Sequence, residues 1–229
     1  LSAIGGDDTY RLLPYLFGGG GLAQAVTDKP FLGFSATTMN HLMLHKVGLN
    51  TFYGQAFLSD VCELGADMLP YTRHYFEQLL STGTIQCIEP SPVWYDERTD
   101  FSPAALGTPL TPHPGRGFVL LQGPPRFSGA ILGGCLDTLY DLFDNTRYAD
   151  SVSLCRSYGL FPPLEDWRGK LLLLETSEER PSPEKYRRMV TALRDTGIFQ
   201  VISGILAGRP IDGTYSEAYQ RILMETVDD

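Results

Sequence analysis

A hydroxyl side chain stands at the first sharp bend of the sequence. Residues 4–16, IGGDDTYRLLPYL, run from an apolar residue through a Gly-Gly pair into a Leu-rich segment. This pattern predicts a strand that breaks into a helix, a turn that exposes one side chain beside the free N–H groups of the first helical turn. The side chain at its tip is that of Thr9, whose hydroxyl is a candidate nucleophile, and the N–H of Tyr10 after it is a candidate donor to an oxyanion. The pattern alone favours a simpler alternative, in which Thr9 only caps the helix.

A carboxylate closes the most apolar segment of the chain. Residues 170–175, KLLLLE, predict a buried parallel strand with Glu175 at its C-terminal end. Such a carboxylate can orient and stabilise the imidazole that removes the proton of a hydroxyl nucleophile. Ligands of α/β folds bind beyond the C-terminal ends of the strands. We therefore expect Thr9 and Glu175 to face one crevice, although a Glu in this position is, without further context, more often solvated.

The histidines give little indication of a metal site. His41 and His45 are four residues apart, a spacing that can place two ligands on one face of a helix. The pair lacks the Glu of an HExxH motif and a third ligand. We therefore expect no metal and no organic cofactor, and we expect His74 and His113 to face solvent.

The first part of the chain predicts a strand, a helix and a second strand. We expect a buried strand over residues 30–34 and Ser35 as the cap of the helix that follows. The apolar stripe of this helix consists of Met39, Leu42, Met43 and Val47. The second strand should cover residues 49–53, and the short connections favour a parallel pair. Another helix is expected over residues 70–80.

Residues 84–126 are richer in proline than the segments on either side. Prolines at eight positions exclude a long helix there. We interpret this stretch as a linker with short extended pieces. Trp94, Tyr95 and Phe101 lie within it, so we expect an aromatic loop that packs against the rest of the protein.

The last part of the chain repeats the strand, helix, strand order. After the strand that ends at Glu175, Ser182 is a good helix cap, Pro183 suits the first helical position and Gly197 ends the helix. A strand is expected over residues 199–207. The two units predict an α/β protein with two lobes: residues 1–83 with the nucleophile, a linker over 84–126, and residues 127–229 with the acid.

The overall composition limits the classes of partner. A net charge of −9 with few Lys and Arg argues against a nucleic-acid ligand. No apolar run is long enough to cross a membrane, so we expect no membrane contact. Cys62, Cys87, Cys135 and Cys155 show neither close pairing nor zinc-type spacing, which indicates reduced thiols in a cytoplasmic protein.

Several motifs in one order resemble a known family, the L,D-carboxypeptidases among the serine peptidases, and most closely its branch similar to microcin C immunity peptidases. The resemblance lies in IGGDDTYRLLPYL, KPFLGFSATTMNHLMLHKVGLNTFYG, PSPVWYDE, GAILGGCLDTL, LLLLETSEERPSP and GIFQVISGILAGRP. It implies a partial flavodoxin-like or Rossmann-like parallel sheet in the N-terminal lobe and a C-terminal α/β domain of the swivelling type.

The resemblance also implies an activity and a set of site residues. It implies a hydrolase that cleaves an amide in an L,D-peptide (a muropeptide) or in a peptidyl or aminoacyl nucleotide, and relatives are commonly homodimers. Thr9 and Glu175 take the nucleophile and acid positions of a Ser-His-Glu triad. The substrate-binding positions fall on Gly6, Trp94 and the turn at Gly133 and Gly134.

Three departures from the family pattern favour a second hypothesis, a relative that binds such ligands without cleaving them. Thr9 stands where Ser is usual, and Ala36 stands where many relatives have Asp. The family's histidine belongs after the segment GRPIDGTYSEAYQRIL, where this chain has none. We therefore expect both ends of the family's fold to be missing and little activity from this chain alone.

Overall fold

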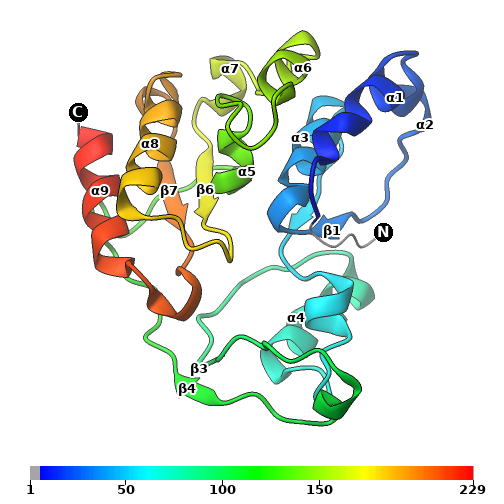
Figure 1. The fold of residues 1–229 in the computed structure, drawn as a ribbon, viewed down its shortest axis with the longest axis vertical. Coiled ribbons are helices and arrows are strands. Elements are labelled where there is room, and N and C mark those ends of the chain that lie inside the picture. The colour runs from blue at the N-terminus through cyan, green and yellow to red at the C-terminus, as the bar shows by residue number, and fades with distance from the viewer. Residues whose placement is uncertain (1–5, 229) are drawn as a thin grey trace.

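The computed structural model describes residues 6–228 of the chain. It is an α/β fold in which helices cover two small parallel sheets, and a Pro-rich segment loops out between the two lobes (Figure 1). The expected fold class is confirmed. Among residues 6–228, no helix combines the length and the apolarity that crossing a membrane requires.

The N-terminal part contains the predicted strand, helix, strand unit. Its elements are the 3-10 helix η1 (Thr9–Leu12), α1 (Leu13–Phe17), α2 (Gly21–Ala25), β1 (Leu32–Gly33), the 3-10 helix η2 (Ser35–Thr37), α3 (Thr38–Lys46) and β2 (Phe52–Tyr53). Strands β1 and β2 pair in parallel, as expected from the short connections. Three residues of the predicted stripe on α3 are buried, Met39, Leu42 and Met43, whereas Val47, directly after the helix, is half-buried.

The middle of the chain is irregular, as its prolines predict. It contains a π-helical turn, η3 (Phe57–Val61), then α4 (Pro70–Thr82), β3 (Val93–Tyr95), the 3-10 helix η4 (Pro103–Ala105) and β4 (Pro112–Pro114). Strands β3 and β4 form an antiparallel pair in which Trp94 lies opposite His113. This pair lies near the chain segment that follows the last strand of the C-terminal lobe (Figure 1).

The C-terminal part is built on a three-stranded parallel sheet. Its elements are β5 (Ile131–Cys135), α5 (Leu136–Tyr140), α6 (Ser151–Ser157), α7 (Leu164–Trp167), β6 (Leu171–Glu175), α8 (Pro183–Arg194), the 3-10 helix η5 (Ile198–Gln200), β7 (Gly204–Ala207), the 3-10 helix η6 (Ile211–Gly213) and α9 (Ser216–Asp228). Strand β6 is central, with β5 and β7 on its two sides. The predicted buried strand that ends at Glu175 is therefore confirmed, as is the Ser182 cap, whose hydroxyl accepts from the N–H of Lys185.

Two details of the predicted elements are wrong. The strand expected over residues 199–207 begins only at Gly204, because residues 198–200 close a 3-10 turn after the positive φ of Gly197. Gly133 and Gly134 do not form a turn. They lie inside strand β5, and helix α5 starts directly after it.

One hydrophobic cluster joins the two lobes. Tyr10, Leu13 and Leu42 of the N-terminal part belong to the same buried cluster as Leu172 and Trp167 of the C-terminal part. Helix α3 lies against β5 and α5, which places the turn before α3 beside the C-terminal ends of β5 and β6. The continuous core therefore sets the distance between groups that are far apart in the sequence.

Candidate active site

Ser35 occupies the turn between strand β1 and helix α3. Its φ of 59° is positive, a conformation that costs a non-glycine residue about 1–3 kcal/mol and that clusters at functional sites. A serine at a tight turn from a strand into a helix is the geometry that presents a nucleophilic hydroxyl at the top of a sheet. The predicted capping role is not observed, because no side chain caps η2. Within residues 6–228 the Ser35 hydroxyl has no hydrogen-bond partner.

Glu175 reaches this turn through Tyr53. The Tyr53 hydroxyl donates a short hydrogen bond to Oε1 of Glu175 and accepts from the N–H of Ser35 at 3.1 Å. Burial raises the pKa of Glu175, while the Tyr53 hydroxyl and the Ser35 N–H hold it down. Burial and the charge of Glu175 raise the pKa of Tyr53, so this hydroxyl stays protonated and remains a donor.

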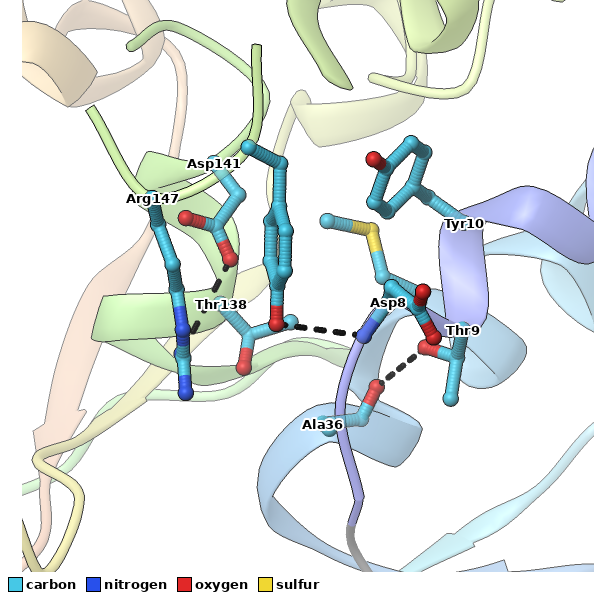
Figure 2. Close-up of a pocket in the computed structure, with 9 residues that line it drawn as sticks. Asp8, Thr9, Tyr10, Ala36, Thr138, Asp141 and Arg147 are labelled. Atoms are coloured by element: carbon cyan, nitrogen blue, oxygen red, sulfur yellow. Dashed lines mark hydrogen bonds and ion pairs between the residues drawn. The ribbon is translucent and has the colours of Figure 1, made fainter. Parts of the chain in front are cut away.

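Thr9 lies against the same turn. Its hydroxyl donates to the carbonyl oxygen of Ala36 at 2.9 Å, the contact drawn in Figure 2. Thr9 and Glu175 therefore converge on neighbouring residues, Ala36 and Ser35, although no direct contact between the two is present among the described residues. The strand expected before Thr9 lies outside the described residues.

The neighbours of Thr9 form a very small cavity. It is lined by Asp8, Thr9, Tyr10, Ala36, Met39, Thr138, Asp141, Arg147 and Tyr148 (Figure 2). Its volume of about 10 Å³ is the room that one water molecule needs. The cavity is too small for a peptide or a nucleotide.

The other residues predicted around Thr9 have different surroundings. The ring of Tyr10 is buried and its hydroxyl donates to Asp150 at 2.5 Å. Gly6 is exposed, and a side chain at its position would meet no atom within 4 Å. The oxyanion role of the Tyr10 N–H and a substrate contact at Gly6 stay predictions.

The glycines of strand β5 allow two parts of the site to approach closely. A Cβ on Gly134 would lie 2.6 Å from both Oγ1 of Thr38 and a ring carbon of Tyr53. A Cβ on Gly133 would lie 2.1 Å from the backbone of Leu173 in β6. Both glycines are buried, so a direct contact with substrate stays a prediction.

Trp94 connects the linker to the C-terminal lobe. Its indole stacks on His113 at 4.2 Å, and the guanidinium of Arg209 lies 3.6 Å from the ring centre. Arg209 directly follows Gly208, which packs against the Cβ of Glu175. The aromatic loop thus borders the strand end that carries the acid. His113, expected to face solvent, is instead half-buried with its Nε2 2.7 Å from Asp96.

Two further groups near the turn lack the properties of a nucleophile or a metal ligand. Burial raises the pKa of the Cys135 thiol to about 12, so it stays protonated at neutral pH. Both ring nitrogens of His41 are occupied, by Thr51 at 2.6 Å and by the carbonyl of Gly33 at 3.0 Å. No cluster of three or more potential metal ligands occurs in the described part of the chain.

Ser35 was predicted only as a helix cap, and Tyr53 was not predicted as a site residue at all. The signal for Ser35 was present, because the segment PFLGFSATT runs from an apolar strand through Gly33 into a helix with a hydroxyl at the bend. A serine before a helix is also an ordinary cap, and only its positive φ and distant partners separate the two roles. No local pattern points to Tyr53, whose partner Glu175 is 122 residues away.

The chain belongs to the LD-carboxypeptidase family. The family's N-terminal domain matches residues 1–54 and its C-terminal domain matches residues 128–229, together more than half of the chain. Its relatives place it in the microcin-immunity-like branch. The microcin C7 self-immunity protein MccF of Escherichia coli is 24% identical over 213 residues, which cover 91% of this chain and 55% of that protein.

Solved structures show the same fold. An MccF-like protein from Streptococcus pneumoniae, in complex with AMP, is 61% identical with a TM-score of 0.96, over 97% of this chain and 65% of that one. MccF in complex with glutamyl sulfamoyl guanosine is 23% identical with a TM-score of 0.71, over 98% of this chain and 62% of that one. A muramoyltetrapeptide carboxypeptidase from Oxalobacter formigenes is 20% identical with a TM-score of 0.54, over 96% of this chain and 65% of that one. The chain therefore spans less than two thirds of each of these relatives.

Proposed function

We propose that this chain carries the nucleophile and the acid of a serine-type hydrolase that cleaves an amide in an aminoacyl or peptidyl nucleotide. In this proposal Ser35 is the nucleophile in place of Thr9, and Glu175 is the acid. The observation that carries the proposal is the strained turn of Ser35, with a free hydroxyl and a backbone tied to Glu175 through Tyr53. Both groups lie beyond strand ends, the usual place for ligands of α/β folds.

The remaining roles follow from the turn. The N–H of the residue after an elbow nucleophile points at the developing oxyanion, which assigns this role to Ala36. Thr9 supports that residue by donating to its carbonyl. The N–H of Tyr10 stays the second candidate for the oxyanion. A hydroxyl nucleophile also needs a base, and the family resemblance implies a histidine that Glu175 would orient.

The substrate class rests on the relatives. The protein that is 61% identical was solved with AMP, and MccF was solved with glutamyl sulfamoyl guanosine and with aspartyl sulfamoyl adenosine. We therefore propose a nucleotide-linked substrate first and an L,D-peptide second. Trp94 borders the acid-bearing strand end, and with Gly6, Gly133 and Gly134 it stays the proposed substrate contact. We keep the homodimer, the cytoplasmic location and a mechanism without cofactor as predictions.

A protein that binds such ligands without cleaving them is the second candidate function. Two observations favour it. None of the described histidines is hydrogen-bonded to Ser35 or Glu175, and by the family resemblance Ala36 stands where many relatives have Asp. Ligand binding in this case would need no proton transfer from Ser35.

A hydrolysis assay on the protein expressed from its whole reading frame tests both candidates. The substrates are an aspartyl adenylate analogue with an amide linkage and an L,D-tetrapeptide, and the variants are Ser35→Ala and Thr9→Val. We expect Ser35→Ala to lower kcat by about 10³-fold or more and Thr9→Val to have a much smaller effect. The reverse order would return the nucleophile role to Thr9, and binding without turnover would support the second candidate.

A further inference from the structure

The Tyr53 hydroxyl lies where four elements of the fold meet. It ends strand β2, and its partners are Glu175 at the end of β6, the N–H of Ser35 in η2 and the hydroxyl of Thr38 in α3 at 3.3 Å. Thr38 in turn accepts from the N–H of Cys135 at the end of β5, at 3.0 Å. One phenol thus connects the acid, the strained turn and two strand ends.

Counting protons assigns a direction to each hydrogen bond. The short contact with Glu175 takes the single Tyr53 proton, because a carboxylate only accepts. The Ser35 N–H can only donate, so Tyr53 accepts from it. The Thr38 proton goes to the carbonyl of Ser35, which at 2.7 Å is nearer than Tyr53. The backbone of Ser35 is therefore held at its N–H by Tyr53 and at its carbonyl by Thr38.

The ring of Tyr53 is fixed by groups outside this network. Gly134 packs against it so closely that no Cβ fits there. His41 lies 5.2 Å from the ring, and its own nitrogens are bonded to Thr51 and to the backbone of Gly33. The position of the hydroxyl is therefore set by the scaffold, before any ligand binds.

We propose that Tyr53 is a positioning residue that orients the carboxylate of Glu175 and holds the N–H of Ser35 in its strained conformation. A hydrogen bond to the charged form of a carboxylate favours that form against the effect of burial. The same hydroxyl satisfies the N–H of Ser35, which has no helix partner because it belongs to the first residue of η2. The importance of Tyr53 for catalysis rests on the proposed function, whereas its effects on Glu175 and on the Ser35 N–H do not.

Other groups also act on Glu175 and must stay constant in a test. The charges of Glu178 and Asp137 raise its pKa, and the Cys135 thiol beside it stays protonated. The Ser35 N–H lowers its pKa. Tyr53→Phe removes one hydroxyl and leaves all of these groups in place.

The direct test is an NMR titration of the side-chain carboxyl carbon of Glu175, assigned with Glu175→Gln. The proposal predicts that Tyr53→Phe raises the pKa of Glu175. The control is Tyr219→Phe, which removes the hydroxyl of another tyrosine, one that is buried and donates to the carbonyl of Pro181, and which should leave this pKa unchanged. An unchanged pKa in Tyr53→Phe would overturn the proposal, because a merely structural tyrosine would behave in this way.

Amide hydrogen exchange gives the second readout. The Ser35 amide should lose protection by about tenfold or more in Tyr53→Phe relative to Tyr219→Phe. Equal protection in the two variants would contradict the proposal. If Tyr53→Phe does not fold, the wild-type Tyr53 Cζ resonance must titrate together with Glu175, and a shift independent of pH would contradict the proposal.

These measurements need no turnover, so they separate this inference from the proposed function. Hydrolysis could be absent while Glu175 and the Ser35 amide still respond to Tyr53→Phe. In that case the proposed function would fail and the positioning role would stand. In the opposite case the enzyme is active and the pH profile of its activity is the same in Tyr53→Phe as in the wild type. The proposed function would then stand and the positioning role of Tyr53 would fail.

Discussion

At the scale of single residues, the choice of nucleophile depends on which hydroxyl lacks a hydrogen-bond partner. The Thr9 hydroxyl donates to the carbonyl of Ala36, whereas the Ser35 hydroxyl has no partner among residues 6–228. A nucleophile must give its proton to a base, so a hydroxyl already engaged with a carbonyl is the poorer candidate. Sequence distance hides this difference, since Thr9 and Ala36 are 27 residues apart.

Thr9→Val tests the supporting role of Thr9. Valine keeps the shape of the side chain and removes the hydrogen bond to Ala36. We expect the free energy of unfolding to fall by about 1 kcal/mol, measured by urea denaturation. Thr9→Ser is the control, because it retains the hydroxyl and removes only the methyl group. A loss of stability in Thr9→Ser as large as that in Thr9→Val would contradict a stabilising role of the hydrogen bond to Ala36.

Asp141 gives a prediction for the pH dependence of stability. Its side chain is 8% exposed, and burial raises its pKa from 3.8 to about 7, while Arg147 and Lys185 lower it and Asp137 and Glu179 raise it. A carboxyl whose pKa is higher in the folded state binds more protons when folded. Its stabilising effect is therefore complete below pH 3.8 and is lost as the pH rises through about 7.

Asp141→Asn should remove this dependence. We expect the variant to be more stable than the wild type by about 1–4 kcal/mol at pH 8 and to differ little at pH 4. Denaturation curves at the two pH values measure the difference. A stability gap that stays constant from pH 4 to pH 8 would show that Asp141 does not titrate in this range.

At the scale of elements, the sequence predicted the helices and strands whose defining residues lie close together along the chain. Strand β6 follows from its leucine run, helix α8 from its cap and stripe, and the β1, α3, β2 unit from its short connections. The family resemblance implied a turn at Gly133 and Gly134, whereas the two residues lie inside strand β5. Their actual role is a close approach to Leu173, Thr38 and Tyr53, which belong to other elements.

Gly134→Ala tests that role of strand β5. A Cβ at this position would lie 2.6 Å from Thr38 and Tyr53, on a backbone with a φ of 148°. We expect a loss of about 2–4 kcal/mol in the free energy of unfolding. Gly19→Ala is the control, because its Cβ would meet nothing within 4 Å. Equal stability of the two variants would exclude close packing as the reason for the glycine.

At the scale of the whole molecule, the fold brings three distant segments to one place. The turn at Ser35, the strand end at Glu175 and the hairpin with Trp94 meet through Tyr53 and Arg209. The lobes and the Pro-rich linker were predictable from composition and periodicity. The place where Ser35, Glu175 and Trp94 come together was not predictable, because it depends on contacts between residues about 100 positions or more apart.

Arg209→Ala should loosen the linker without unfolding the lobes. A cation–π contact contributes about 0.5–1 kcal/mol at exposed sites, so we expect faster proteolysis within residues 84–126 and a nearly unchanged Tm. Arg168→Ala is the control, since Arg168 is exposed and has no ion pair or ring contact within the described part of the chain. Equal cleavage rates in the two variants would mean that Arg209 does not hold the hairpin.

The most direct test of the account is to locate the reactive hydroxyl. The protein from the whole reading frame is treated with a fluorophosphonate that labels activated serines and threonines, and the modified peptide is sequenced by tandem mass spectrometry. We predict a single adduct on Ser35, which disappears in Ser35→Ala and is retained in Thr9→Val. An adduct on Thr9, or labelling that survives in Ser35→Ala, would contradict the account.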